Sequence, residues 1–543
     1  MSGVLNKIGT RSGKIWAGKT READVGGGGA APTWDTIADG AISDGDKCII
    51  KSDGKVSGLP NLGTGLYGEG STPGHQVHDD GKNGISLYDT VNDKVICFYQ
   101  RTNSGGTWNY GFLRHGTVNG PAKTITWANE VQITSGQVQG HIMCYDPVNG
   151  IVACFSRDVG NSFYCSVVLA KVTGAGFSKS STYTIESTSG TPYAAEFDTQ
   201  NNKVILVYNT NASYMIMGTI SYDSGMGLME WAQGTKVNLG FGNGGNLTGA
   251  YKPGALGGML LAGKISNVGK CTPIFISAGN LVHGTDVNLD SGSTSNYDEA
   301  FHAQYDPDTG NFLVTRMRGS QAGGGYPHDD ARDIVSTVVE VGTPFNTFSV
   351  KPTVLVADAL PDLGYPGDNY YTRGGQIGYD ENENKYMVCW YSEGDAYKGH
   401  LRIGEIQSGQ IVWSASKHTF ITTRLNLSYK GHAAVWDPDT NSLILFYDNI
   451  YGNENVLTTF IDTSVALTNL TTSNFIGIAD GAYADGITAS IQMRGHIDDA
   501  QSGLTIGSEY FVQADGTLAL TADGNVGSIP AGTALSSTKI LIK

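Results

Sequence analysis

The sequence predicts an all-β protein, a seven-bladed β-propeller flanked by small β-rich terminal segments. Three observations lead to this expectation. A motif of an aromatic residue, an aspartate, a turn and an apolar strand recurs along most of the chain. The 543 residues include 75 Gly and 27 Tyr, a composition that suits many short strands joined by frequent turns. No long stretch has the 3.6-residue apolar period of an amphipathic helix.

The repeated motif sets the number of blades. Six copies read LYDTVNDKVICFY, CYDPVNGIVACF, FDTQNNKVILVY, YDPDTGNFLVT, YDENENKYMVCWY and WDPDTNSLILFY, with their aspartates at Asp89, Asp146, Asp198, Asp306, Asp380 and Asp437. The steps in numbering from each aspartate to the next are 57, 52, 108, 74 and 57. Because 108 is twice 54, a degenerate copy is expected midway, and Ala250–Gly254 followed by Met259–Leu261 keeps all but the Asp. Seven repeats of this size match four-stranded propeller blades.

The turn residues of each repeat predict a tight hairpin between the first two strands of a blade. Asp accepts backbone N–H groups, Pro presets φ, and the following Gly or Asn tolerates a left-handed conformation. Turns such as DPDTG could alternatively bind calcium, but the distal bidentate acid of a calcium loop is missing. We therefore expect neither a metal site nor a cofactor. Cys97, Cys154 and Cys389 occupy matching strand positions, which predicts buried, reduced side chains.

Charge narrows the range of partners. The formal net charge is −16, so phosphates of nucleic acid and anionic lipid would repel the body of the protein. No apolar run is long enough for a membrane span, and the N-terminus lacks the apolar segment of a signal peptide. We therefore expect no nucleic-acid binding, no membrane insertion, and synthesis and assembly in a cytosol. Five basic residues precede the first acid, Glu22, and form a basic arm that either docks on an acidic neighbour or is simply solvated.

Two related segments flank the repeats. Ile37–Gly45 reads IADGAISDG and Ile478–Gly486 reads IADGAYADG, and the two share non-turn residues as well as Gly and Asp. We expect them to form related β elements that pack near each other. The predicted domains are a basic arm at 1–30, a small β segment at 31–70, the propeller at 71–473 and a β module at 474–543.

The C-terminal segment, from Asn474 onward, carries a family resemblance. FIGIADGAYADG, GLTIGSEYFVQADGTL and the ending AGTALSSTKILIK resemble a small β module of virion and tail-appendage proteins of tailed bacteriophages. The resemblance implies a virion structural protein of tail-fibre or appendage type, attached to other virion proteins by its terminal segments. It also implies a homo-oligomer, although the sequence has no coiled-coil heptads. The propeller would then recognise a glycan or protein on the host surface.

Long insertions indicate where recognition would occur. In a four-stranded blade, the second-to-third loops and the crossovers between blades share one face, and Gly74–Gly84, Gly319–Arg332 and Ala359–Gln376 all map there. Flat aromatics, carboxylates and an Arg suit sugar rings or a polar protein surface. The predicted ligand-binding residues are Tyr365, Tyr370, Tyr371, Arg373, His78, Asp79, Asp80, His328, Asp329 and Asp330. Loop capping by the two His-Asp-Asp sequences, and loop packing by the tyrosines, are the structural alternatives.

Catalytic motifs are missing from the sequence. No GxSxG, Walker A or HExxH pattern occurs, so we expect a protein that is not an enzyme and has no catalytic residues. Two alternatives to host recognition stay open. The first is a purely architectural capsid decoration or tail connector protein. The second is a glycan-degrading tailspike enzyme, in which paired carboxylates among the His-Asp-Asp loops would have to lie at a glycosidase separation.

Overall fold

The repeats fold into antiparallel strands joined by short turns, and the described residues contain no helix, so none there could cross a membrane. This computed structural model describes residues 33–39, 41–50, 54–59, 66–67, 76–78, 81–102, 109–120, 122–160, 162–241, 247–254, 257–265, 268–289, 299–319, 332–343, 345–360, 374–392, 398–407, 409–414, 417–421, 425–426, 434–449, 455–461, 463, 470, 472–484, 486–513, 516–522 and 528–543. The chain forms two compact units. The ring unit comprises Leu66–Val412 and His418–Thr463, and the terminal unit comprises Met1–Gly65, Trp413–Lys417 and Ser464–Lys543.

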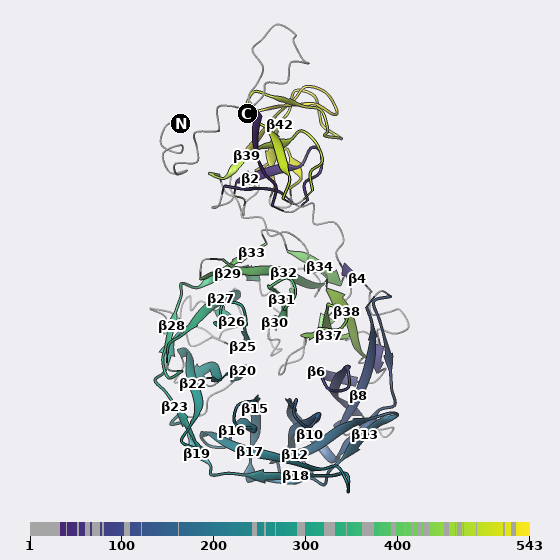
Figure 1. Cartoon of the computed structure of the whole chain (residues 1–543), viewed down its shortest axis with the longest axis vertical. Helices are drawn as coiled ribbons and strands as arrows, with labels where there is room; N and C mark the ends of the chain where they lie inside the picture. The colour runs from purple at the N-terminus through teal and green to yellow at the C-terminus, as the bar shows by residue number, and fades with distance from the viewer. Residues whose placement is uncertain are drawn as a thin grey trace, which may run out of the picture. The chain divides into compact units, whose positions relative to one another are not determined.

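The sheets of the ring unit lie around a common centre, as in a β-propeller (Figure 1). Each sheet takes the name of the inner strand that begins its hairpin. The β6 sheet holds β6 (Gly81–Asp89), β7 (Lys94–Thr102), β8 (Asn109–Asn119) and β9 (Thr124–Trp127). The long strand β10 (Val131–Asp146) pairs with β8 and then begins the β10 sheet, with β11 (Ile151–Asp158), β12 (Tyr164–Thr173), β13 (Gly176–Lys179) and β14 (Tyr183–Ser189).

The next sheets repeat the same antiparallel order. The β15 sheet holds β15 (Thr191–Asp198), β16 (Lys203–Asn209), β17 (Ser213–Asp223), β18 (Leu228–Gln233) and β19 (Val237–Asn238). The β20 sheet holds β20 (Thr248–Lys252), β21 (Gly258–Ile265), β22 (Val268–Ser277), β23 (Asn280–His283) and β24 (Val287–Asn288). The degenerate repeat forms the expected hairpin, because Tyr251 pairs with Met259 across β20 and β21.

The remaining ring sheets follow the same plan. The β25 sheet holds β25 (Glu299–Tyr305), β26 (Phe312–Gly319), β27 (Arg332–Val341), β28 (Phe348–Val350) and β29 (Val354–Leu360). The β30 sheet holds β30 (Gly374–Asp380), β31 (Lys385–Ser392), β32 (Lys398–Gln407), β33 (Gln410–Trp413) and β34 (His418–Ile421). The β36 sheet holds β35 (Leu425–Asn426), β36 (Ala434–Asp437), β37 (Ser442–Asn449) and β38 (Asn455–Ile461).

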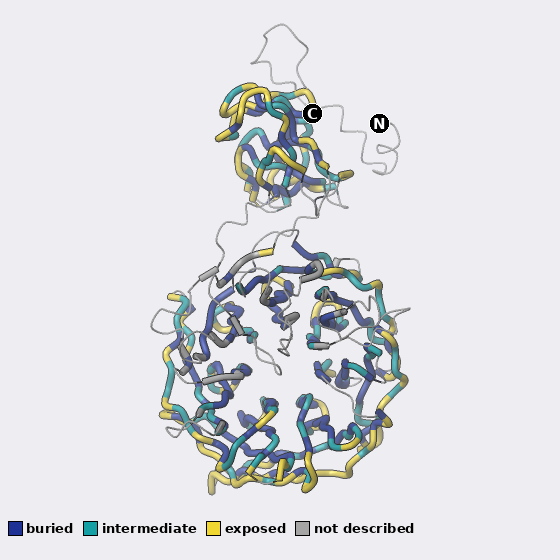
Figure 2. The backbone as a smooth tube through the Cα atoms, turned by 180° about the vertical axis from the view of Figure 1, so that it is seen from behind, coloured by how far each residue is buried: buried dark blue, intermediate teal, exposed yellow. Residues whose placement is uncertain are grey.

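The outer strand of the β36 sheet comes from the start of the ring unit. β4 (Leu66–Tyr67) and β5 (Gln76–His78) both pair with β38, so residues far apart in sequence complete one sheet. Apolar side chains between the β36 and β6 sheets then form one buried cluster that includes Val95, Cys97, Ile444 and Phe446. Figure 2 shows buried residues on the strands inside the ring and exposed residues along its outer rim.

The terminal unit contains two small antiparallel sheets. One holds β1 (Thr33–Ile37), β40 (Thr488–Gln492), β39 (Phe475–Ala479), β2 (Lys47–Ile50) and β3 (Val56–Gly58) in that order. The other holds β41 (Ile497–Asp498), β45 (Ile540–Ile542), β44 (Pro530–Ala534), β42 (Glu509–Val512) and β43 (Leu518–Ala519). Residues from both ends of the chain, among them Ile49, Ile478 and Ile540, share one hydrophobic core.

The two IADG segments interlock with a local two-fold relationship, which confirms that they are related and adjacent. Ile42 and Tyr483, at equivalent positions, exchange two backbone hydrogen bonds of 2.9 and 2.7 Å. The pairs on either side are also equivalent: the Ala38 amide donates to the Ile487 carbonyl and the Ala479 amide donates to the Asp46 carbonyl, each at 2.8 Å. Accordingly, β1 of the first copy pairs with β40 of the second, and β2 pairs with β39.

Candidate functional site

Most residues predicted to bind a ligand lie outside the described residues. Asp79, Asp80, His328, Asp329, Asp330, Tyr365, Tyr370, Tyr371 and Arg373 are all in this group. His78 is placed by its backbone alone, as a strand residue of β5 paired with Val456. Their role in binding stays a prediction.

Strand order gives the ring two chemically different ends. The hairpin end carries the turns between the first and second strands of each sheet, such as Thr90–Asp93. The loop end carries the connections between second and third strands, such as Val159–Phe163, and those between successive sheets. A first strand therefore begins at the loop end, and a second strand finishes there.

The hairpin end is organised by the repeated aspartates, as the turn chemistry predicts. Asp306, for example, is buried and accepts backbone N–H bonds from Asp308 at 2.9 Å and Thr309 at 3.2 Å. Its second oxygen accepts the Thr309 hydroxyl at 2.9 Å, and Gly310 closes the turn at a φ of 72°. The same pattern recurs with an Asn donor in place of Thr at Asp89, Asp146 and Asp198.

Each of four aspartates also accepts a hydroxyl from the neighbouring sheet, a contact that the motif search did not reveal. The donor is the tyrosine that precedes the Asp position of another repeat, a position held by Lys252 in the degenerate repeat. The pairs are Tyr145 with Asp89, Tyr251 with Asp198, Tyr379 with Asp306, and Tyr88 with Asp437. The last pair joins the first repeat to the last. Burial raises the pKa of these tyrosines, so their hydroxyls stay protonated and able to donate.

Repeats that lack the tyrosine or the aspartate use other contacts. Phe197 follows Asp146 in the ring and has no hydroxyl to donate. In the degenerate repeat, Lys252 occupies the Asp position, and its ammonium donates to the Gly310 carbonyl at 2.9 Å and lies over the Tyr305 ring. The degenerate repeat therefore keeps a contact between sheets at the hairpin end, although its sequence departs from the motif.

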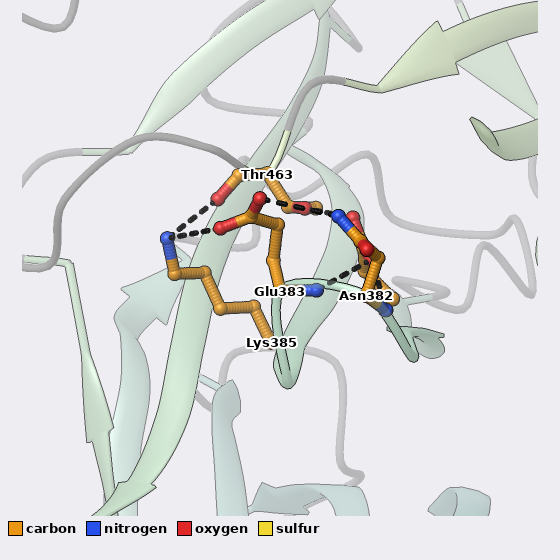
Figure 3. Close-up of polar contacts among 5 residues, drawn as sticks. Asn382, Glu383, Lys385 and Thr463 are labelled. Atoms are coloured by element: carbon orange, nitrogen blue, oxygen red, sulfur yellow. Dashed lines mark hydrogen bonds and ion pairs between the residues drawn. The ribbon is translucent and has the colours of Figure 1, made fainter. Parts of the chain in front are cut away.

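Asp380 has a hydroxyl donor of another kind, the Thr463 side chain. The Thr463 carbonyl accepts a 2.9 Å bond from the Lys385 ammonium (Figure 3). Lys385 also lies 3.7 Å from a Glu383 carboxylate oxygen. Thr463 follows the third strand β38, so this contact ties the β30 sheet to the chain that leaves the β36 sheet.

The loop end carries a varied set of buried polar side chains in place of a repeated motif. These are Gln100, His141, His302, Arg316, Gln376 and His400. The Gln100 amide nitrogen lies 3.2 Å from both the Val138 carbonyl and His141 Nδ1. Arg316 is 0% exposed, and its guanidinium donates to the Thr337 hydroxyl at 3.0 Å. Burying such groups costs free energy unless they are hydrogen-bonded, so their concentration at one end distinguishes it chemically from the other.

One exposed aromatic residue stands at the loop end of the β10 sheet. Phe163 is 37% exposed and, like Ser162, adopts a positive φ, 66° for Phe163 and 55° for Ser162. The Arg157 guanidinium carbon lies 4.3 Å from the centre of the Phe163 ring. The Arg157 Nη atoms donate to Gln139 at 3.3 Å and Ser189 at 3.2 Å. The sequence prediction did not include this cluster, because a single Arg and a single Phe have no motif.

The inner strand of the β15 sheet carries a carboxyl group with an unusual pKa. Burial raises the pKa of Glu196 to about 8, so this carboxyl is largely protonated at neutral pH. The equivalent position of the β25 sheet holds Gln304, a neutral residue of the same shape, whose amide donates to the Tyr305 carbonyl at 3.3 Å. The two equivalent positions therefore both carry mainly neutral side chains at neutral pH.

The cysteines confirm the predicted burial and correct part of the predicted alignment. Cys97, Cys154 and Cys389 are buried thiols that form no disulfide, on the second strands β7, β11 and β31. Cys97 and Cys154 pair with equivalent residues, Ser86 and Met143, but Cys389 pairs with Gln376, so it lies one position further along its strand. Burial raises the pKa of Cys154 and Cys389, so neither is a reactive thiolate. Among the residues with described positions, no group of three His, Cys, Asp or Glu side chains is arranged to hold a metal ion.

Comparisons with known proteins concern the fold. No family model and no curated protein matches the chain. The β-propeller domain of the Trilobed protease from Pyrococcus furiosus is similar, with a TM-score of 0.35, 9% identity, and coverage of 72% of this chain and 99% of that chain. A candidate 6-phosphogluconolactonase from Bacteroides uniformis has a TM-score of 0.41 and 10% identity, over 62% of this chain and 85% of that one. The intramolecular trans-sialidase from Ruminococcus gnavus has a TM-score of 0.39 and 10% identity, over 73% and 97%.

These comparisons correct one expectation. The prediction that the protein is not an enzyme was wrong as a conclusion drawn from missing motifs, because the similar structures include two that are described as enzymes, a candidate lactonase and a trans-sialidase. The prediction relied on missing sequence motifs, and propellers bring residues together from separate blades, where no linear motif records them. At 10% identity the likeness extends to the fold alone and assigns no catalytic residue to this chain.

Proposed function

We propose that this protein is a virion structural protein of a tailed bacteriophage, of tail-fibre or appendage type, whose ring recognises a glycan or protein on the host surface. The difference between the two ends of the ring carries the proposal. The hairpin end repeats one hydrogen-bonding scheme that joins neighbouring sheets, whereas the loop end holds varied polar groups. Recognition requires a surface whose chemistry differs from place to place, and loops on a rigid scaffold supply it.

We further propose that the ring has seven blades. Six Asp hairpins and the Tyr251–Leu261 hairpin would each open one blade. Pairing of β4 and β5 with β38 would complete the last blade with strands from the start of the ring. The bond between Tyr88 and Asp437 supports this closure, because it links the first and last repeats at the hairpin end.

The terminal unit would attach the protein to the particle and to other virion proteins, within a homo-oligomer. The support for this role is the resemblance of the segment from Asn474 onward to a module of phage virion proteins. The interlocked IADG segments add a physical reason. The segments that precede and follow the ring in the sequence pair with each other, so together they fold as a single anchoring unit. Removing residues 1–60 and 474–543 should abolish incorporation into virions.

The experiment compares the two ends in host-cell binding by the purified full chain. Alanine at Tyr365, Tyr370, Tyr371 and Arg373 together should weaken binding at least tenfold, because aromatic and Arg side chains carry much of the energy of recognition surfaces. The matched control changes Val91 and Val148, exposed residues of two hairpin turns, to Ser. Equal binding by both variants, with unchanged melting transitions, would refute recognition by the loop end. If only the variant with Val91 and Val148 changed to Ser failed to be incorporated into virions, the architectural alternative would be favoured.

A further inference from the structure

The loop between β11 and β12 holds an aromatic side chain at the surface by means of an unfavourable backbone. Positive φ values at two consecutive non-Gly residues, Ser162 and Phe163, are sterically costly for L-residues, and most of all for a bulky one. The Gly190 amide donates to the Phe163 carbonyl at 2.9 Å and helps to fix the conformation. Burial does not explain it, because the Phe163 side chain stays partly exposed. Strain of this kind concentrates at functional sites.

Arg157 brings a positive charge that has no carboxylate partner among the described residues. Its Nη atoms contact only the neutral groups of Gln139 and Ser189, and its buried Nε has no hydrogen-bond acceptor. Glu186, on the neighbouring strand β14, is paired with Lys236 instead. The chain has 51 acidic and 35 basic residues, so an Arg left without a carboxylate is available for an anion from outside.

The surroundings favour a sugar over a protein. Gln139, Ser162 and Ser189 around the Phe163 side chain are exposed and polar, so hydrogen-bonding groups surround Phe163. A protein interface would need a larger, more apolar centre, whereas one aromatic ring with amide and hydroxyl groups matches the size of one sugar residue. Burial raises the pKa of Tyr193, and the Arg157 charge opposes this rise, which places a second aromatic residue near the guanidinium.

We propose that the Arg157–Phe163 cluster is a binding subsite for an anionic saccharide. The guanidinium would take a carboxylate or phosphate of the sugar through its free N–H groups, in the forked geometry that suits both anions. The exposed part of the Phe163 ring would contact the apolar face of the sugar, and Gln139 and Ser189 would bind hydroxyl groups. This inference rests on the proposed function and names the ligand class for one part of the loop end.

The test measures binding of small saccharides to the purified full chain by calorimetry. The probes are trigalacturonic acid, its uncharged counterpart galactotriose, and mannose 6-phosphate. Comparison of the two acidic probes distinguishes binding of a carboxylate from binding of a phosphate. We expect one acidic probe to bind at least tenfold more tightly than galactotriose. Arg157→Gln should remove that preference, and Phe163→Ala should weaken both charged and neutral probes. Lys179→Gln, which removes a charge from the outer strand β13 of the same sheet, should have no effect.

The result that overturns the inference is equal binding of the acidic probes by Arg157→Gln and the parent, or no binding of either acidic probe at millimolar concentration. Binding of a polyglutamate peptide alone, dependent on Arg157, would also overturn it and assign the cluster to a protein partner. Host-cell binding by the parent chain distinguishes failure of the saccharide subsite from failure of the proposed function. If cells are bound while both acids fail, the subsite is wrong and recognition by the ring stands. If cells are not bound either, the proposed function fails as well.

Discussion

The two ends of the ring are formed by the same strands but differ in the regularity of their buried polar side chains. At the hairpin end, one aspartate in each of most repeats organises its own turn and accepts a tyrosine hydroxyl from the next sheet. At the loop end, the buried polar side chains include Gln, His and Arg, on first, second and third strands, and follow no repeated motif. The repeat is thus retained where neighbouring sheets must fit together, and it is lost where the surface is free to vary.

The largest expected effect is the loss of stability that follows removal of an aspartate from the hairpin end. Asp306→Ala removes the acceptor of two backbone N–H groups and two hydroxyls from a side chain that is only 3% exposed. Buried donors left without acceptors each cost of order 1 kcal/mol, so we expect unfolding to require about 3 kcal/mol less free energy. Urea denaturation of the purified chain measures the loss.

A neighbouring carboxylate supplies the control for that substitution. Asp308 is exposed in the same turn, and Asp308→Ala should change the free energy of unfolding by less than about 0.5 kcal/mol. Saccharide and host-cell binding should be unchanged in both variants, because neither residue lies at the loop end. If the two substitutions were equally destabilising, the hydrogen bonds of Asp306 would not explain the stability of the hairpin end.

The second expected effect concerns the interior between the two ends. The pKa of Glu196 is about 8 in the folded protein and near 4.5 when the chain is unfolded, so the folded state binds the extra proton. Its contribution to stability is complete below pH 4.5 and is lost as pH rises to 8. Glu196→Gln should therefore stabilise the protein by about 2 kcal/mol at pH 8 and by much less at pH 5, after allowance for partial solvation.

Melting temperatures measured from pH 5 to 8 test this dependence. The parent should lose stability across that range more steeply than Glu196→Gln. Gln304→Glu provides the reverse change at the equivalent position of the β25 sheet and should steepen the dependence. Parallel curves for the parent and Glu196→Gln would show that Glu196 ionises freely and that the ring interior is wetter than its pKa implies.

Sequence reasoning was most successful where geometry repeats. The Asp turns, the degenerate hairpin at Tyr251 and the buried cysteines all follow from local rules that act within a single hairpin. The aromatic before each Asp was also visible, but its partner lies in another repeat, far along the chain, so the need for a tyrosine hydroxyl was not. The Arg157–Phe163 cluster has no counterpart in other repeats, and self-similarity cannot reveal a feature that occurs once. The loops that were predicted to bind ligand lie outside the described residues.

The third expected effect isolates one hydroxyl of the hairpin end. Tyr251→Phe removes the 2.8 Å bond to Asp198 while leaving the aspartate with its two backbone donors and Asn201. A hydrogen bond to a charged acceptor contributes about 1.5 kcal/mol, so unfolding should become easier by that amount. Urea denaturation measures it, and no loss of stability would mean that the contact between sheets is incidental to packing.

The smallest expected effect runs in the opposite direction and uses the one tyrosine position that holds Phe beside an intact aspartate. Asp146 accepts two backbone N–H groups and the Asn149 amide, and no hydroxyl reaches it from the β15 sheet, where Phe197 stands at the tyrosine position. Phe197→Tyr would place a hydroxyl where Tyr145, Tyr251 and Tyr379 place theirs. Because the acceptor is already ordered by its turn, we expect a gain of up to about 1 kcal/mol in the free energy of unfolding. A Tyr145→Phe, Phe197→Tyr double variant should then approach the stability of the parent, since one contact between sheets replaces another. If Phe197→Tyr is instead destabilising, the β10 and β15 sheets pack too closely at this point for a hydroxyl, and the repeats are not equivalent at the hairpin end.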